Sequence, residues 1–256
     1  MRYYGRSILG LLTVLMLCAS CKREEPGHSE LIRQVASEDV KERLAAIEKL
    51  VPVATDADVE QVGAILLGNG SEQVRAYAAY TLELAKNRKA VPDLIKALQA
   101  AKPGEWLIRA WSIRALATIG DERGNEPVFS AIHADGVNDA DTRIEYARAF
   151  AVFKNPKSVP LLIPMIEYDN PKNQATINNL NIAVAKALGH QGNSGALRTL
   201  QRLLDNADIN TARAAAGAIG KIVGENFDEP VQIERFMTMQ LPSPPKAKAW
   251  MQSHAN

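Results

Sequence analysis

Cysteine is the residue type in this chain best suited to covalent chemistry, and both cysteines stand near its start. Cys18 and Cys21 are the only thiols among 256 residues. They follow a positive segment with Arg2 and Arg6, and then an apolar run of eleven residues, Ser7 to Leu17. That run is shorter than the roughly 20 residues with which a helix spans a bilayer, and it is typical of a secretory leader. We therefore expect residues 1–20 to be a signal peptide.

The residues around Cys21 resemble a bacterial lipobox, the motif at which signal peptidase II cuts just before a cysteine that carries diacylglycerol. Ala19 and Ser20 are small, as in that motif, whereas Cys18 stands where the motif usually has Leu. The resemblance implies that Cys21 is lipidated and that its acyl chains attach the protein to a membrane. An ordinary signal peptide that leaves Cys21 as a free thiol is the alternative.

Lys22 follows Cys21 at the position where retention in the inner membrane usually shows Asp. The lipobox resemblance therefore favours a periplasm-facing protein of the bacterial cell envelope, at the outer membrane rather than the inner. Residues 21–28 form a short tether, whose seven residues after the cysteine reach at most about 25 Å. The folded part is expected to stay close to the lipid surface.

Composition and charge bound the class of protein. Loss of residues 1–20 leaves 28 basic side chains against 29 acidic ones, a balance of −1. Nucleic-acid-binding domains usually carry a clustered basic surface, so no nucleic-acid partner is expected. A hydrophobic content of 46% supports a packed core, and an aromatic content of only 5% favours close-packed helices over a β-sandwich.

Six segments repeat one pattern, in which a large apolar residue follows a smaller one about one helical turn earlier. Their last residues, which we call the anchors, are Leu50, Leu82, Leu116, Phe150, Leu188 and Ile219. The intervals between anchors are 32, 34, 34, 38 and 31 residues, which indicates a structural repeat. The residue seven positions before the anchor is arginine in the first four segments: Arg43, Arg75, Arg109 and Arg143.

A second helical pattern follows four of these segments after a short polar turn. These patterns are VPDLIKAL (91–98), EPVFSAIH (126–133), VPLLIPMI (159–166) and SGALRTLQRLL (194–204). Pro92, Pro127 and Pro160 suit the first helical position, and Asp139, Asn170 and Asp208 are candidate N-caps. Pro164 falls inside a helix and should kink it. Such helix pairs must stack on their neighbours to bury their apolar stripes.

The chain resembles the HEAT-like repeat family, in the short bacterial form known from phycobilisome lyases. The resemblance rests on VRAYAAYTL (74–82), on IRAWSIRALATIGD (108–121) and on AVPDLIKAL (90–98). It implies an all-α fold, a right-handed α-solenoid of five to six helix pairs over residues 29–239. HSELIRQVASED (28–39) is expected to form an N-terminal cap, NPKNQATINNLN (170–181) a lengthened loop or helix start, and residues 240–256 a Pro-rich tail.

Residue patterns for catalysis or metal binding are missing from the sequence. His28, His133, His190 and His254 are the only histidines, and none is followed by Glu, as in iron-binding HEAT-repeat hydroxylases. No H-E-x-x-H, G-x-G-x-x-G or P-loop motif occurs. GHQG (189–192) is interpreted as a turn with a glycine C-cap. We expect no catalytic residue, no metal and no cofactor.

Two tryptophans and the repeated arginines are weak candidates for binding. Trp111 shares a helical stripe with Ile108 and Ala115, so packing is expected. Trp106 lies at a helix start and is expected to be partly exposed. The four arginines are expected to pair with acids of neighbouring units.

The function predicted from these features is a lipid-anchored, non-catalytic scaffold that binds another protein of the cell envelope. In the HEAT family the second helices line the concave side, which implies a binding row on their outward positions: Glu60, Lys96, Ser130, Glu167, Arg198, Arg202 and Arg235. Arg198 and Arg202 lie on one side of a helix, and with Arg235 they are expected to hold an acidic segment.

Two alternatives remain at this point. The phycobilisome relatives suggest a lyase or isomerase that handles a bilin or a similar ligand. LPSPPKAKAW (241–250) suggests instead a structural envelope component whose extended Pro-rich segment makes the contact.

Overall fold

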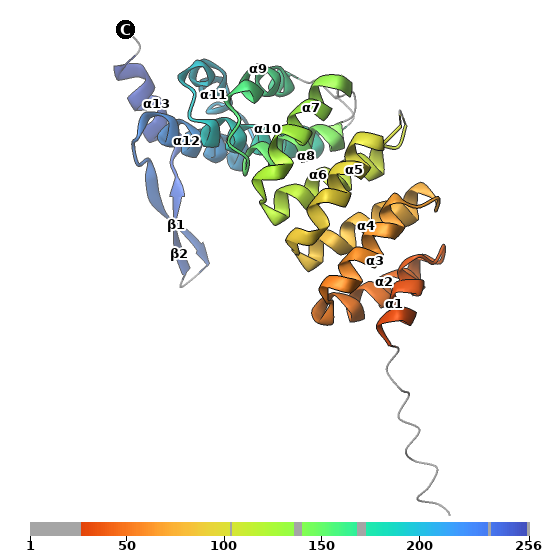
Figure 1. Ribbon diagram of the computed structural model, residues 1–256. Coiled ribbons are helices and arrows are strands. Elements are labelled where there is room, and N and C mark those ends of the chain that lie inside the picture. The colour runs from red at the N-terminus through yellow and green to blue at the C-terminus, as the bar shows by residue number, and fades with distance from the viewer. Residues whose placement is uncertain (1–26, 103, 136–139, 168–172, 235–236, 255–256) are drawn as a thin grey trace, which may run out of the picture.

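The molecule is a curved stack of helix pairs (Figure 1). The structure is a computed structural model that describes residues 27–102, 104–135, 140–167, 173–234 and 237–254. The first helices of the pairs are α2 (Val40–Leu50), α4 (Glu72–Ala85), α6 (Trp106–Ile119), α8 (Ala140–Phe150), α10 (Gln174–Gln191) and α12 (Ile209–Val223). The second helices are α3 (Asp56–Leu67), α5 (Val91–Ala100), α7 (Asn125–Asp135), α9 (Val159–Leu162) and α11 (Leu197–Leu203). The predicted all-α solenoid is confirmed.

The helices begin where the sequence supplies caps. Asp208 accepts a hydrogen bond from the backbone N–H of Thr211 at 2.8 Å, as predicted for an N-cap of α12. Thr55 and Asp58 form a reciprocal capping box at the start of α3. Pro92 and Pro160 stand in the first turns of α5 and α9. The other two predicted caps, at positions 139 and 170, lie outside the described residues.

The predicted kink at Pro164 appears as a change of helix type. Regular α-helix ends at Leu162, and a 3-10 segment, Ile163–Glu167, continues the element. Ile163 is half-buried there. The expected glycine C-cap is confirmed at Gly192, which has a φ of 68°, but residues 189–191 of the predicted turn belong to the last turn of α10. Helix α10 starts at Gln174, so most of the segment predicted as a lengthened loop or helix start is helical.

The anchors form the centre of the core. Each anchor has at most 1% of its surface exposed: Leu50, Leu82, Leu116, Phe150, Leu188 and Ile219. One continuous hydrophobic cluster joins residues from Leu31 of α1 (His28–Val35) to Ala247 near the C-terminus. The expected N-terminal cap is present as α1, which packs on α2 and α3.

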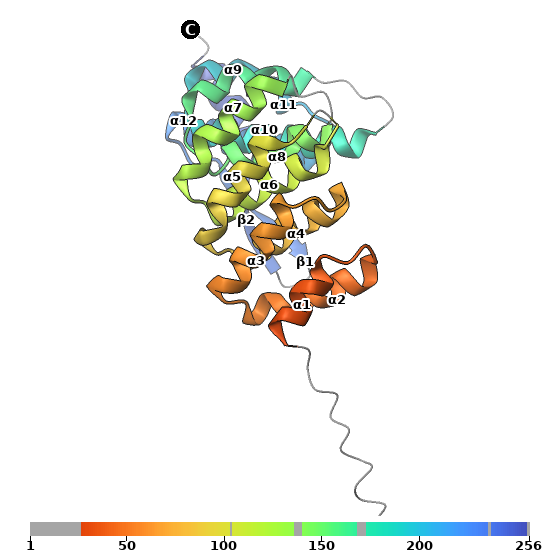
Figure 2. The same ribbon diagram turned by 45° about the vertical axis from the view of Figure 1, so that its right-hand side comes forward.

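The first helices form the inner layer of the curve. Four neighbouring pairs pack directly together, namely α4 with α6, α6 with α8, α8 with α10 and α10 with α12. These helices carry small buried residues such as Ala115, Ala149, Ala185 and Ala218, and Ala218 of α12 lies against Gly189 of α10. In Figure 1 the second helices α5, α7, α9 and α11 lie on the outer side of the arc, and Figure 2 shows the pairs stacked along it. Close spacing in one layer bends the stack toward that layer, so the first helices line the concave face.

The C-terminal end departs from the repeat. Strands β1 (Asp228–Glu234) and β2 (Met237–Pro242) form an antiparallel hairpin, and α13 (Pro244–Ser253) follows it. The prediction of a sixth second helix around position 235 is therefore wrong. The prediction of an extended segment at 241–250 is also wrong, because Ser243 caps a helix whose first turn accommodates Pro244 and Pro245. Phe227, Ala247 and the ring of Trp250 pack this end against the core.

The packing of the first helices can be tested where α10 and α12 meet at a glycine. A Cβ atom added at Gly189 of α10 would lie 2.7 Å from the Cα and 2.9 Å from the Cβ of Ala218 on α12. Gly189→Ala should therefore lower the free energy of unfolding by about 1–3 kcal/mol despite its better helix propensity. Thermal unfolding followed by circular dichroism measures the change. Gly27→Ala, where an added Cβ meets no atom within 4 Å, is the control; equal stability of both variants would contradict the packing argument.

Candidate binding groove on the inner face

A groove lies on the inner face where α6 and α8 run side by side. Its volume is about 380 Å³. Its lining comes from α6, α8 and the first turns of α10: Trp106, Leu107, Ala110, Trp111, Arg114, Asp141, Ile144, Glu145, Arg148 and Asn179. A second hollow of about 430 Å³ continues along the same two helices past Thr118 and Val152, and it shares Arg114, Glu145 and Arg148 with the first.

The two tryptophans of α6 make one wall of this groove. Trp106 is 44% exposed, which confirms the predicted exposure. Trp111 packs partly against the core, as predicted, yet the rest of its ring lines the groove. Its ring is held between Tyr80, whose centroid is 4.9 Å away, and the guanidinium carbon of Arg114 at 4.7 Å. An aromatic surface fixed in this way is suited to stacking or apolar contact.

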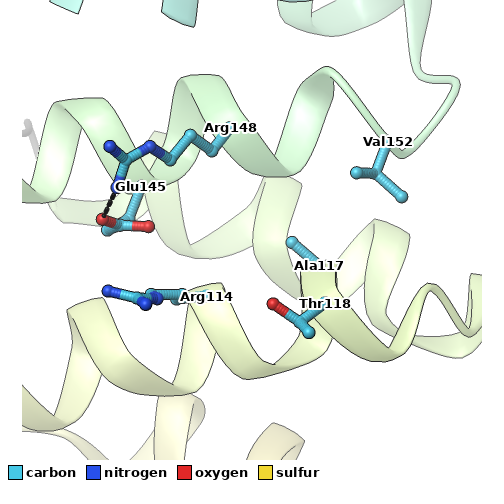
Figure 3. Close-up of a pocket in the computed structure, with 6 residues that line it drawn as sticks. All are labelled: Arg114, Ala117, Thr118, Glu145, Arg148 and Val152. Atoms are coloured by element: carbon cyan, nitrogen blue, oxygen red, sulfur yellow. Dashed lines mark hydrogen bonds and ion pairs between the residues drawn. The ribbon is translucent and has the colours of Figure 1, made fainter. Parts of the chain in front are cut away.

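Charged side chains alternate along the floor of the groove. Arg114 donates from Nε to Oε1 of Glu83 on α4 at 2.9 Å, and Thr118 donates to the same oxygen at 3.1 Å. Arg148 donates to Oε1 of Glu145 at 2.6 Å. Figure 3 shows Glu145 between the side chains of Arg114 and Arg148. The buried carboxylates thus hold two guanidinium groups whose side chains remain 41% and 52% exposed, for Arg114 and Arg148 respectively.

The carboxylate of Glu145 has an unusual environment. Burial raises its pKa above the ordinary value, and the positive charges of Arg148 and Arg114 oppose that rise. The Oε2 atoms of Glu83 and Glu145 are buried and have no hydrogen-bond partner among the described residues. Neither free oxygen reaches solvent, so these groups are placed to orient arginines rather than to contact a ligand.

Basic residues recur at one position of the repeat on this face. Arg114, Arg148 and Lys186 each stand two residues before an anchor, on α6, α8 and α10. All three side chains keep substantial exposure. We call these three residues the inner basic row. The sequence-based prediction did not include this row, although alignment of the six segments on their anchors places a basic residue two positions before the anchor in three consecutive segments.

The row predicted on the second helices has a different location. Glu60, Lys96, Ser130, Arg198 and Arg202 are exposed, but α3, α5, α7 and α11 belong to the layer opposite the first helices. The premise that second helices line the concave face is therefore wrong for this chain. Glu60 contacts Lys89 at 3.6 Å and Lys96 pairs with Asp93 at 3.2 Å. The side chain of Glu167 and all of Arg235 lie outside the described residues.

The repeated arginines hold turns in place. Arg43 donates to the carbonyl of Ser37, Arg75 to that of Leu66 and Arg109 to that of Ala101. The carbonyls of Ser37 and Ala101 lie in the connection before the arginine's own helix, and that of Leu66 lies in the last turn of α3. Arg75 also pairs with Glu105 of the following unit at 3.0 Å, so the predicted pairing with acids is confirmed for this residue. Arg43 is fully buried and lies over the ring of Tyr77. These arginines do not form an exposed cationic row.

The described residues of the groove supply aromatic and guanidinium groups. Within the described residues no group of three His, Cys, Asp or Glu side chains is arranged to hold a metal ion. No helix in the described ranges is both long enough and apolar enough to cross a membrane. The side chain of His133 and all of Cys21 fall outside the described part of the chain. What the groove does offer is an aromatic wall beside guanidinium groups, a combination that suits apolar and carboxylate groups.

Comparison with known proteins supports the repeat and the fold. Residues 59–137 match the family described as HEAT repeats. The complex of CpcE and CpcF of phycocyanin lyase from Nostoc sp. PCC7120 superposes with a TM-score of 0.55 at 21% identity, over 77% of each chain. An engineered protein superposes with a TM-score of 0.50 at 18% identity, over 78% of this chain and 98% of that one. No curated protein sequence matches the chain. At these identities the likeness establishes the fold alone.

The buried carboxylate of Glu145 should make the stability of the protein depend on pH. Folding raises the pKa of Glu145. The stabilisation that comes with this shift is therefore fully present when the pH is below the ordinary pKa of 4.5, and it is lost as the pH rises through the pKa of the folded state. Glu145→Gln removes this titration. The melting temperature of the wild type minus that of the variant should therefore increase as pH falls from about 7 to about 5. A difference that decreases over this range would show that the ionised form is favoured by folding.

Proposed function

We propose that this HEAT-repeat protein is a non-catalytic scaffold, lipid-anchored at Cys21 in the bacterial cell envelope, that binds another protein through its inner groove. The observation that carries the proposal is the pairing of an exposed Trp106 and a fixed Trp111 with the guanidinium groups of Arg114 and Arg148 in one concave site. Tryptophan and arginine are the residues most enriched at the energetic centres of protein interfaces.

The chemistry of the groove favours binding over catalysis. Its guanidinium groups remain charged at any physiological pH, and they donate hydrogen bonds rather than transfer protons. Glu145, a carboxylate with a raised pKa, is committed to Arg148, and its other oxygen is buried. The likeness to a phycocyanin lyase complex at 21% identity concerns the fold and does not by itself favour a bilin-modifying activity.

The anchor is proposed from the sequence. Cys21 follows the leader-like segment, and the first described helix, α1, begins at His28. A tether of this length would keep the solenoid within about 25 Å of the lipid surface. The partner is then a protein that reaches the same membrane surface, and the outer membrane is the proposed location.

The anchor can be tested apart from the groove. Cys21→Ser should move the protein from the membrane fraction to the soluble fraction and abolish labelling by a fatty-acid analogue, because no other cysteine follows the leader. Cys18→Leu, which removes the other thiol and supplies the residue that the lipobox motif usually has at this position, is the control and should retain the label. Equal labelling of the Cys21→Ser variant and the wild type would refute lipidation at this residue.

The groove is tested by crosslinking in the native host. Replacement of Trp106 by the photoreactive amino acid benzoylphenylalanine should give a specific adduct with a partner protein after irradiation, since the position is exposed and borders the groove. Val53 is 53% exposed in the turn between α2 and α3, away from the groove, and the same replacement there is the control. Absence of an adduct at position 106, or the same adduct from both positions, would contradict binding at the groove.

A further inference from the structure

The inner basic row extends beyond the groove along the concave face. Arg114 and Arg148 each donate one hydrogen bond to a buried acid, Glu83 and Glu145 respectively, and their other N–H groups have no hydrogen-bond partner among the described residues. Lys186, the third member, is exposed and has no ion pair with a described residue. The row therefore carries donors that the acids of the described part of the chain do not satisfy.

The spacing of the row matches an extended polypeptide. Helices α6, α8 and α10 pack side by side, and packed helices are about 8–10 Å apart. An extended chain in the polyproline II conformation advances about 3.1 Å per residue with three residues per turn, so every third side chain points to the same side. A segment that crosses these helices would thus place about every third side chain over successive members of the row.

The groove adds an apolar subsite at one end of this path. Trp106, Leu107 and Trp111 lie on α6, ahead of Arg148 on α8 and Lys186 on α10. Its volume of about 380 Å³ accommodates a large apolar side chain together with part of its backbone. A segment that crosses from α6 to α10 therefore meets the apolar subsite first and the basic side chains afterwards.

We infer that the concave face of α6, α8 and α10 binds an extended acidic polypeptide segment of the partner. This inference rests on the proposed function and specifies its ligand. An apolar side chain enters the groove beside Trp106 and Trp111, and two carboxylates about three residues apart pair with Arg148 and Lys186. A single-stranded nucleic acid fits less well, because its continuous phosphates would meet Asp141 and Glu145 at the groove.

A defined peptide tests the inference on the full-length chain in detergent. The probe is a fluorescent peptide of about ten residues with one Trp followed by two Glu at intervals of about three residues. Fluorescence anisotropy should show binding that weakens as NaCl is raised to about 0.5 M. The same peptide with Gln in place of Glu should bind at least about tenfold more weakly, because both charge-assisted contacts are lost.

Matched variants locate the contact. Arg148→Gln combined with Lys186→Gln should weaken binding of the acidic peptide by about tenfold or more. Arg198→Gln combined with Lys157→Gln removes two exposed cations on the outer side and should change the affinity by less than about twofold. Should the first pair of changes impair folding, Lys186→Gln alone serves, since Lys186 has no ion pair with any residue that the structure describes.

Three outcomes would overturn the inference. They are equal binding of the Glu and Gln peptides, equal loss in both double variants, and tighter binding of a single-stranded oligonucleotide than of the acidic peptide at this row. If the peptide fails to bind while the crosslink at position 106 persists, the acidic ligand is wrong and the protein-binding groove stands. If the crosslink is also absent, the proposed function itself fails.

Discussion

Close contact between successive first helices is the constraint on which the rest of this structure depends. Alanine and glycine occupy the contact positions, down to the pair Gly189 and Ala218, where no additional methyl group fits. The outer helices pack less closely, since neither α7 with α9 nor α9 with α11 is in comparably close contact, so the two layers differ in spacing and the stack bends. Curvature then turns equivalent positions of consecutive units toward one another, which is how Trp111, Arg114 and Arg148 come to share one groove.

The groove combines rigid and adaptable parts. Buried carboxylates at Glu83 and Glu145 fix the guanidinium groups of Arg114 and Arg148 before any ligand arrives, which reduces the conformational entropy lost on binding. Tyr80 similarly fixes the ring of Trp111. Trp106 and Lys186, by contrast, are exposed and free to adjust. In such a recognition surface the buried acids orient the guanidinium groups, and the exposed side chains make the contacts with the ligand.

Sequence periodicity predicted which residues would be buried but not on which side of the curve each helix would lie. The anchors, the cap at Asp208 and the turn at Gly192 follow from local chemistry that the sequence displays. The concave side follows from a difference in spacing between layers, which depends on packed side-chain volumes across units. The hairpin was missed although Val231 and Ile233, and Met237, Met239 and Leu241, alternate with the period of a strand. The expectation of a sixth helix pair obscured that pattern.

The C-terminal hairpin and α13 have a consequence for assembly. A solenoid that ends on a bare repeat exposes an apolar face that another copy can continue, and such head-to-tail growth produces open fibres. Here Pro242 of β2 packs against Gly217 of α12, while Phe227 and Trp250 cover the same end. At the opposite end α1 covers α2 and α3. Because elements unlike the repeat cover both ends of the described solenoid, neither end offers a bare repeat face on which a second copy could stack.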